Sequence, residues 1–101
     1  MKFSDRVYEI VRKIPEGKVM TYKQIAEKLN TKAYQAIGQA LKKNPYAPEV
    51  PCHRVVKSDG NIGGFFGQIK GKEIERKTKL LESEGIKIIN GKVDEFEKVK
   101  S

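Results

Sequence analysis

The sequence predicts one mostly α domain with a minor β part. Its 101 residues suit a single domain, 1–101, with a modest core. In the first half, apolar residues recur at helical spacing in three segments, and turn residues follow each segment. Near the C-terminus, Asn90-Gly91 lies between β-prone residues and predicts a short hairpin over 86–94. These patterns favour packed helices beside a hairpin or small sheet.

The first helix is expected to end at Pro15-Glu16-Gly17. Ser4 can cap its N-terminus, and Phe3 before the cap can pack on Tyr8 as a hydrophobic staple. Its apolar residues follow the i, i+3, i+4, i+7 pattern of a helix with one buried face, namely Val7, Ile10, Val11 and Ile14.

Two shorter helices joined by a tight turn are expected over about 21–44. Thr21 and Gln24 have the spacing of a capping box that opens the first of them, and Asn30 stops it. Thr31 can cap the second, which spans about 32–43 and terminates at Asn44-Pro45. The second helix is expected to bury Ala33, Ala36, Ile37, Ala40 and Leu41, which leaves Tyr34, Gln35, Gln39, Lys42 and Lys43 largely for the outer side.

This pair of helices is similar to a helix-turn-helix, so the expected fold class is winged helix-turn-helix-like. Gly38 lies inside the second helix, where glycine costs about 1 kcal/mol relative to alanine. A close packing contact would explain why a glycine stands there. The alternative is an ordinary three-helix cluster that binds no nucleic acid, and periodicity alone does not exclude it.

The second half of the chain is less regular. Residues 44–51 contain three prolines and predict a stiff, extended connector. A turn at Asp59-Gly60 precedes a glycine-aromatic loop at 62–67, and a helix over about 72–84 follows, for which Gly85 suits the C-terminal cap. The charged end, residues 95–101, is expected to be frayed.

Composition narrows the class of protein. No stretch approaches the roughly 20 apolar residues of a membrane helix, and no signal peptide is visible. A single unpaired cysteine fits a reducing compartment, so we expect a cytoplasmic protein, or a nuclear one in a eukaryote. The net charge is +8, and residues 1–57 hold 12 Lys/Arg against 5 Asp/Glu. This basic half suggests a polyanion-binding face, with a solvated lysine-rich surface as the alternative.

The segment Pro51-Cys52-His53-Arg54-Val55-Val56 holds the only cysteine and the only histidine of the chain. A thiol reacts as its thiolate, so His53 could take the proton and Arg54 could stabilise the negative charge. A buried, unreactive cysteine in a valine-rich segment is an equally good interpretation of these residues alone. Cys52 and His53 are too few for a zinc site, and we expect neither a metal nor a cofactor.

Four segments together resemble the C-terminal domain of the O6-alkylguanine-DNA alkyltransferase family. They are residues 21–26 (TYKQIA), 36–45 (AIGQALKKNP), 51–56 (PCHRVV) and 63–65 (GGF), and their order and spacing match the family from about residue 3 to 85. The usual N-terminal domain of the family does not appear, which fits either a naturally short member or an excised domain.

The resemblance implies a function in DNA repair. Members bind duplex DNA in the minor groove, flip out an O6-alkylguanine and move its alkyl group irreversibly to a cysteine, here Cys52. By position, His53 would deprotonate the thiol through a water and Glu84 would orient the imidazole. Asn44 would brace the turn that carries the site, and Tyr22 would push the target phosphate and hydrogen-bond the guanine. The protein would act as a monomer, without a cofactor.

The resemblance also implies two groups of binding residues. Contacts to DNA would come from the second helix of the pair and from the active-site segment, namely Tyr34, Gln35, Ala36, Gln39, Lys42, Lys43 and Arg54. The flipped base would be held by the Val55 carbonyl and the glycine-aromatic loop, with Gly64, Phe65 and Phe66.

Three departures from the family pattern are visible. Gln35 stands where the family usually has an arginine that fills the gap left by the flipped base, and Tyr34 is beside it. Phe66 replaces a small polar residue, and the connection from Gly67 to Leu80 is longer than usual. Two alternatives follow: an alkyltransferase-like protein that recognises the lesion without transfer, although such proteins replace the cysteine, or a small winged-helix transcription regulator.

Overall fold

The computed structural model describes residues 2–47, 49–63 and 71–101. It confirms a mostly α fold with small strands. None of the described helices is long and apolar enough to cross a membrane. In chain order the elements are α1 Phe3–Arg12, β1 Met20–Thr21, α2 Tyr22–Lys28, α3 Tyr34–Lys42, the 3-10 helix η1 Cys52–Arg54, β2 Val55–Val56, α4 Lys72–Ser83, β3 Ile88–Ile89, β4 Lys92–Val93 and α5 Phe96–Val99.

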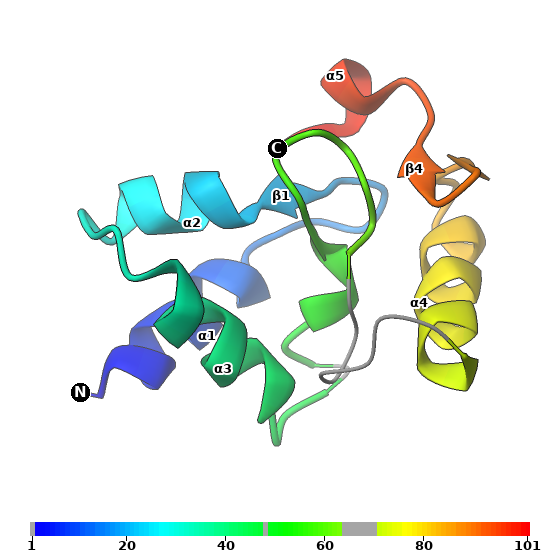
Figure 1. Ribbon diagram of the computed structural model, residues 1–101. Coiled ribbons are helices and arrows are strands. Elements are labelled where there is room, and N and C mark those ends of the chain that lie inside the picture. The colour runs from blue at the N-terminus through cyan, green and yellow to red at the C-terminus, as the bar shows by residue number, and fades with distance from the viewer. Residues whose placement is uncertain (1, 48, 64–70) are drawn as a thin grey trace.

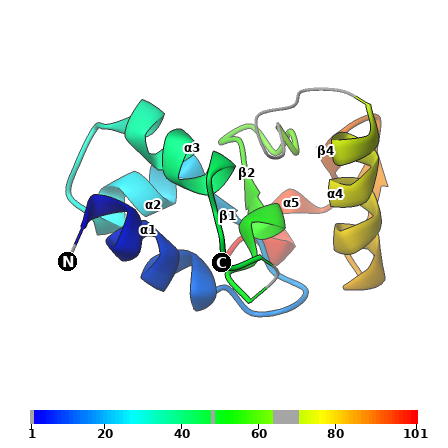
Figure 2. The same cartoon turned by 90° about the horizontal axis from the view of Figure 1, so that it is seen from below.

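The helices form two groups with a small parallel sheet between them. Helices α1, α2 and α3 pack on one another, and α4 stands on the opposite side of β1 and β2 (Figure 1). The view from below shows the same separation, with α5 near β1 (Figure 2). The C-terminal end of the chain lies beside β1, far from the N-terminal end of α1 (Figure 1).

Two hydrophobic clusters fill the interior. The first joins the three N-terminal helices to the active-site segment, and Val7, Ile25, Ile37 and Val55 are fully buried in it. The second lies between the sheet, α4 and the C-terminal hairpin, and consists of Val19, Val56, Ile62, Leu81, Ile86 and Val93. Because Val55 and Val56 belong to different clusters, β2 is anchored from both faces, as alternation along a strand requires.

The parallel pairing of β1 with β2 was not expected from the sequence. Met20 pairs with Val55 and Thr21 with Val56. Strands of two residues are too short to leave a periodic signal, so only the fold reveals them. The pairing places the N-terminus of α2 directly beside the segment that carries Cys52, and it therefore positions the site.

The expected start of α1 was wrong by two residues. The helix begins at Phe3 and its N-cap is Lys2, whose backbone N–H donates to Oδ2 of Asp5 at 3.1 Å. Ser4 therefore lies inside the first turn, and Phe3 is part of the helix instead of a residue before the cap. An acidic side chain in the first turn satisfies a free amide there, which explains why the helix can begin before the serine.

The capping box of α2 is confirmed, whereas the details of α3 differ from expectation. Thr21 Oγ1 accepts from Gln24 N, and Gln24 Oε1 accepts from Thr21 N. The α3 helix begins at Tyr34 with Ala33 as N-cap, because the Thr31 hydroxyl binds the Ala33 amide in the preceding turn. Ala33 and Ala36 are exposed, so the buried side of α3 is narrower and carries Ile37, Ala40 and Leu41.

The packing explanation for Gly38 was also wrong. A Cβ built at Gly38 meets no atom within 4 Å among the described residues. The glycine opens instead onto a surface pocket beside α3. Since no contact within the described chain requires it, its cost in helix stability needs another explanation.

The end of the chain is more ordered than its charge suggested. Asn90 and Gly91, with φ values of 50° and 75°, form the turn of the expected hairpin, in which β3 and β4 are antiparallel. Gly85, with φ 86°, follows the C-cap of α4 as expected. The frayed end was wrong: residues 96–99 form α5, and Val19 N–H donates to the Val99 carbonyl at 2.9 Å.

Removing the side-chain cap of α2 should destabilise the fold. Thr21→Ala leaves the Gln24 amide without its acceptor, and we expect the free energy of unfolding to fall by about 1 kcal/mol. Urea unfolding followed by circular dichroism measures it. Thr31→Ala is the matched control, because Thr31 binds one amide in an exposed turn, and it should cost less. Equal losses in the two variants would contradict the capping role of Thr21.

Candidate active site

Cys52 begins the 3-10 helix η1, directly before β2. Its thiol is buried, with the residue 6% exposed. Its amide donates to the Val50 carbonyl at 2.8 Å, and the Arg54 amide donates to the Pro51 carbonyl at 2.9 Å, so the segment is tightly turned. Burial raises the pKa of the Cys52 thiol, while a hydrogen bond from Asn44 and the charge of Lys77 act to lower it. The thiol is therefore neutral at rest and needs a proton acceptor to react.

Asn44 braces the connector that leads to Cys52. Its Nδ2 donates to the Val50 carbonyl at 2.8 Å, and its Oδ1 accepts from the Tyr46 amide at 3.0 Å. The Asn44 side chain is buried, so its bond to the Val50 carbonyl is shielded from water. The two bonds hold the connector closed just before η1, which suits the bracing role expected for this residue.

Glu84 joins the two residues that follow Cys52. Its Oε2 lies 2.9 Å from His53 Nε2 and 2.6 Å from an Arg54 terminal nitrogen, and its Oε1 accepts from Arg54 Nε at 2.9 Å. The Arg54 guanidinium also donates to the Ile14 carbonyl at 2.8 Å. The carboxylate side chain is only 9% exposed, yet a bidentate arginine and an imidazole satisfy it.

The hydrogen bond to Glu84 fixes the state of the His53 ring. Burial lowers the pKa of His53, and the Glu84 carboxylate offsets only part of that effect. For Glu84, burial raises the pKa, but the bonds from Arg54 and His53 outweigh it and leave the pKa below its ordinary value. A neutral imidazole therefore donates from Nε2 to an ionised carboxylate, which leaves the Nδ1 lone pair free to accept a proton.

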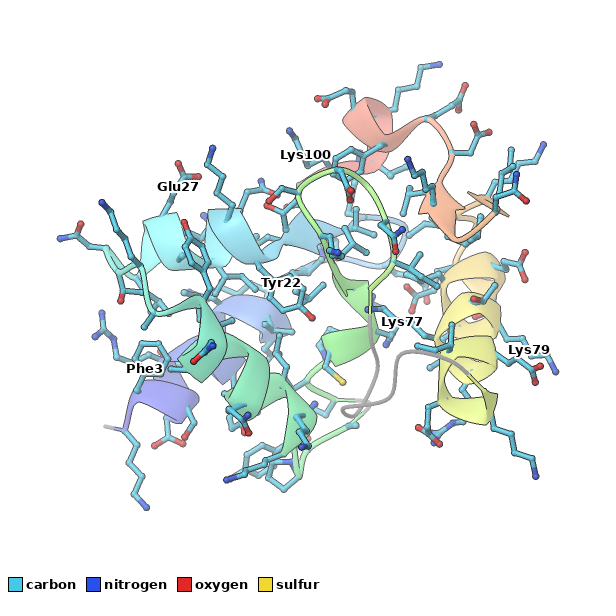
Figure 3. All side chains as sticks on the ribbon, in the orientation of Figure 1. Phe3, Tyr22, Glu27, Lys77, Lys79 and Lys100 are labelled. Atoms are coloured by element: carbon cyan, nitrogen blue, oxygen red, sulfur yellow. The ribbon has the colours of Figure 1, made fainter. Side chains whose placement is uncertain are left out.

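Lys77 is a site residue that the sequence analysis missed. It is 1% exposed, and its Nζ donates to the carbonyls of Val55, at 2.8 Å, and Ile62. Figure 3 shows Lys77 pointing from α4 toward β2, whereas Lys79 points outward. Burial lowers the pKa of Lys77 to about 8. A signal existed: position 77 shares a helical face with Ile74 and Leu81, three and four residues away.

An open pocket of about 540 Å³ lies between α3 and the segment after β2. Tyr22, at the start of α2, lines it and lies between α2 and α3 (Figure 3). Burial raises the pKa of the Tyr22 hydroxyl, and charge on Cys52 raises it further, so this phenol keeps its proton. The other described lining residues are Tyr34, Gln35, Gly38, Lys57, Asn61 and Gly63.

The outer face of α3 carries the residues expected to contact DNA. Tyr34 is 48% exposed. The remaining residues of this face are also exposed, namely Gln35, Ala36, Gln39, Lys42 and Lys43. Tyr34 and Gln35 reach the pocket edge, so the face and the pocket form one continuous surface.

Two expected site residues have partners inside the protein. Arg54, expected to contact DNA from the active-site segment, has its guanidinium bound by Glu84 and the Ile14 carbonyl, and its side chain is 15% exposed. The Val55 carbonyl accepts from Lys77. Gly64, Phe65 and Phe66 lie outside the described residues. Over the described ranges, no cluster of three or more His, Cys, Asp or Glu side chains could hold a metal ion.

Comparisons with known proteins point to one family. Residues 2–86 match the family model described as 6-O-methylguanine DNA methyltransferase, DNA binding domain. A methylated-DNA–protein-cysteine methyltransferase from Saccharolobus islandicus is 50% identical over 82 residues, which are 81% of this chain and 50% of the relative. The chain thus spans about half the length of the curated relatives it matches.

Two solved structures are similar in fold. The O6-methylguanine-DNA methyltransferase from Pyrococcus kodakaraensis has a TM-score of 0.71 and 44% identity, over 85% of this chain and 47% of that one. Schizosaccharomyces pombe Atl1, solved in complex with damaged DNA containing O6-carboxymethylguanine, has a TM-score of 0.83 and 30% identity. The alignment with Atl1 covers 100% of this chain and 98% of that one.

The role of Glu84 can be measured on the only histidine of the chain. Glu84→Gln removes the carboxylate that raises the pKa of His53, so that pKa should fall further below its ordinary value. Proton NMR of the ring against pH measures it. Glu73→Gln is the matched control, because Glu73 pairs with Arg76 on the exposed side of α4. A His53 pKa that is unchanged in Glu84→Gln would contradict the arrangement.

The same pair makes stability depend on pH. The lowered pKa of His53 means that the unfolded chain binds a proton before the folded chain does. The free energy of unfolding of the wild type should therefore fall as the pH falls below about 6.5. Protonation of Glu84, whose pKa is also lowered, should add to the loss at more acidic pH. Urea unfolding at several pH values checks both signs.

Proposed function

The chain belongs to the 6-O-methylguanine DNA methyltransferase family through its DNA-binding domain, and from this premise we propose that it removes alkyl groups from O6 of guanine in duplex DNA. The acceptor is Cys52, and the reaction consumes the protein. The observation that carries this proposal is the placement of the only thiol. It directly precedes an imidazole that Glu84 orients, and it lies close enough to the pocket-lining Tyr22 for its charge to raise the Tyr22 pKa.

Transfer begins with the loss of the thiol proton. The buried thiol has a raised pKa, so the thiolate forms only when a base takes its proton. His53 is that base, with Nδ1 as the accepting atom, because Nε2 is held by Glu84. The imidazolium is stabilised by the adjacent carboxylate, which Arg54 in turn holds in place. The charge of Lys77 favours the thiolate once it has formed.

The thiolate then attacks the alkyl carbon. A sulfur–carbon bond forms, the bond from that carbon to O6 breaks, and its electron pair stays on the guanine. The leaving guanine needs a proton or hydrogen bond, and the Tyr22 phenol, which keeps its proton, supplies one. Tyr22 regains a proton from solvent, and His53 releases to solvent the proton that it took from the thiol, so no net proton is gained or lost. The products are an S-alkylcysteine and an unmodified guanine.

DNA lies against α3 in the minor groove, and the lesion base is flipped into the pocket. A base must leave the stack before a pocket can reach its O6 edge. The exposed α3 side chains contact the duplex, and Lys42 and Lys43 bind phosphates. Gln35 and Tyr34, at the pocket edge, help to fill the gap left by the base. Gly64, Phe65, Phe66 and the Val55 carbonyl bind the flipped base.

A second candidate function is lesion recognition without transfer. It is favoured by the fold similarity to Atl1, with a TM-score of 0.83 against 0.71 for the methyltransferase structure. The intact thiol of Cys52 favours transfer. The two functions differ in whether Cys52 gains a covalent group.

Intact mass after reaction with DNA decides between them. Incubation with excess duplex containing O6-methylguanine should add the mass of one methylene group, mapped to the peptide that contains Cys52. Cys52→Ser should abolish the gain while retaining lesion binding. The same duplex with guanine in place of the lesion is the control. An unchanged mass of the folded wild type, with the lesion intact, would contradict transfer and favour the recognition function.

Gly38→Ala should separate stability from DNA recognition. The added methyl group meets no described atom and improves helix propensity, so the free energy of unfolding should rise by about 1 kcal/mol. The methyl group faces the pocket where the DNA lies, so alkyl transfer from duplex should slow. Single-turnover rates and urea unfolding measure the two effects. A variant that is more stable and equally fast would show that the glycine has no role in binding.

A further inference from the structure

Residues 87–101, called here the C-terminal extension, lie beyond the part of the chain that matches the family model. They form β3, β4 and α5. Much of the extension packs against residues 57–63, called here the pocket wall. The pocket wall supplies Lys57, Asn61 and Gly63 to the pocket, opposite α3. The extension therefore supports one side of the site that the proposed function assigns to the flipped base.

Backbone hydrogen bonds join the extension to the pocket wall. The Ile62 amide donates to the Gly91 carbonyl at 2.9 Å, and the Val93 amide donates to the Gly60 carbonyl at 2.9 Å. Asn61 and Lys92 form an antiparallel bridge between these two bonds. The hairpin thus adds the pocket wall as a third, short strand.

Side chains reinforce this pairing. A Cβ built at Gly60 would lie 3.3 Å from the Phe96 ring, so the ring rests directly on the backbone of the pocket wall. Ile62 and Val93 are buried in the same cluster, against which Phe96 and Val99 pack. On its other side, the Ile62 carbonyl accepts from Lys77. Ile62 is therefore held between the extension and the buried lysine of the active site.

The extension is also anchored beside the opposite side of the pocket. The Val19 amide donates to the Val99 carbonyl at 2.9 Å, and the Ser101 amide donates to the Val19 carbonyl at 2.7 Å. Val19 immediately precedes β1, which leads into Tyr22. The C-terminal extension thus connects the pocket wall to β1, the strand that positions Tyr22 in the pocket.

We propose that the C-terminal extension sets the spacing between the pocket wall and α3, and so controls how well the pocket discriminates a flipped, alkylated guanine from normal DNA. Phe96 is its positioning residue: it acts on the pocket through Gly60 and touches no base. Binding of undamaged duplex does not depend on this spacing, because it uses the exposed face of α3, which is not part of the C-terminal extension. The proposal rests on the proposed function, since it concerns the same pocket.

The experiment compares two duplexes of one sequence, with and without O6-methylguanine, in binding titrations followed by fluorescence anisotropy. Every protein in the titrations carries Cys52→Ser, so that the lesion is not repaired during the measurement. Phe96→Ala should reduce the ratio of the two affinities by about tenfold, because small displacements of positioning groups have effects of that size or larger. Affinity for the undamaged duplex should change by less than about twofold. Ile89→Ala is the matched control, because Ile89 lies in β3 of the same C-terminal extension but is 46% exposed, and it should change neither value.

Hydrogen exchange gives an independent readout. The Ile62 amide, which donates to Gly91, should lose protection in Phe96→Ala and keep it in Ile89→Ala. If Phe96→Ala does not fold, Phe96→Leu, which keeps an apolar side chain but removes the ring, takes its place and should lose part of the discrimination.

The proposal would be overturned if Phe96→Ala lowered the affinities for both duplexes equally. It would also be overturned if the affinity ratio stayed the same although the Ile62 amide lost its protection. A wild type that binds the lesion duplex selectively without transferring the methyl group would contradict alkyl transfer and leave this test intact. A Cys52→Ser protein without lesion preference, or a preference that survives Phe96→Ala, would overturn the role of the extension and leave alkyl transfer to be decided by intact mass.

Discussion

The shared carboxylate of Glu84 is the interaction on which the site depends. Through Arg54 it reaches the carbonyl of Ile14 just beyond α1, and through its own position at the end of α4 it fixes that helix against η1. A carboxylate with 9% of its side chain exposed is costly unless it is paired. Here the groups that compensate the charge are the neighbours of the nucleophile. The pairing that stabilises the buried carboxylate in the folded protein therefore also positions the segment that contains Cys52.

Burial imposes the second constraint. Removing the thiol from water opposes its ionisation, and placing a lysine in the same interior opposes the charge of that lysine as well. Each group favours the charged form of the other, and Asn44 adds a hydrogen bond to the sulfur. The consequence is a Cys52 thiol that stays neutral in the resting protein.

Local chemistry explains which features could be predicted from the sequence. The Thr21–Gln24 capping box, the Asn90-Gly91 turn and the α2–α3 pair depend on neighbouring residues, and all are present in the structure. The structure also places His53 against Glu84, a pairing that only the family resemblance implied. By contrast, the β1–β2 pairing, the inward turn of Lys77 and the ordered α5 depend on contacts between distant segments. The packing contact predicted for Gly38 was wrong because helical spacing shows which side of a helix faces inward but not how closely a neighbouring segment approaches it.

The strand segment that begins at Val19 is paired along both of its edges. Successive residues of a strand direct their backbone groups to opposite sides, so Val19 bonds the C-terminal segment while β1 pairs with β2. An open edge would offer free amides and carbonyls to a strand of another molecule, which is a common route to aggregation. In this protein the last residues of the chain occupy that edge. The charged tail thus protects the centre of the fold against self-association through β-strand addition.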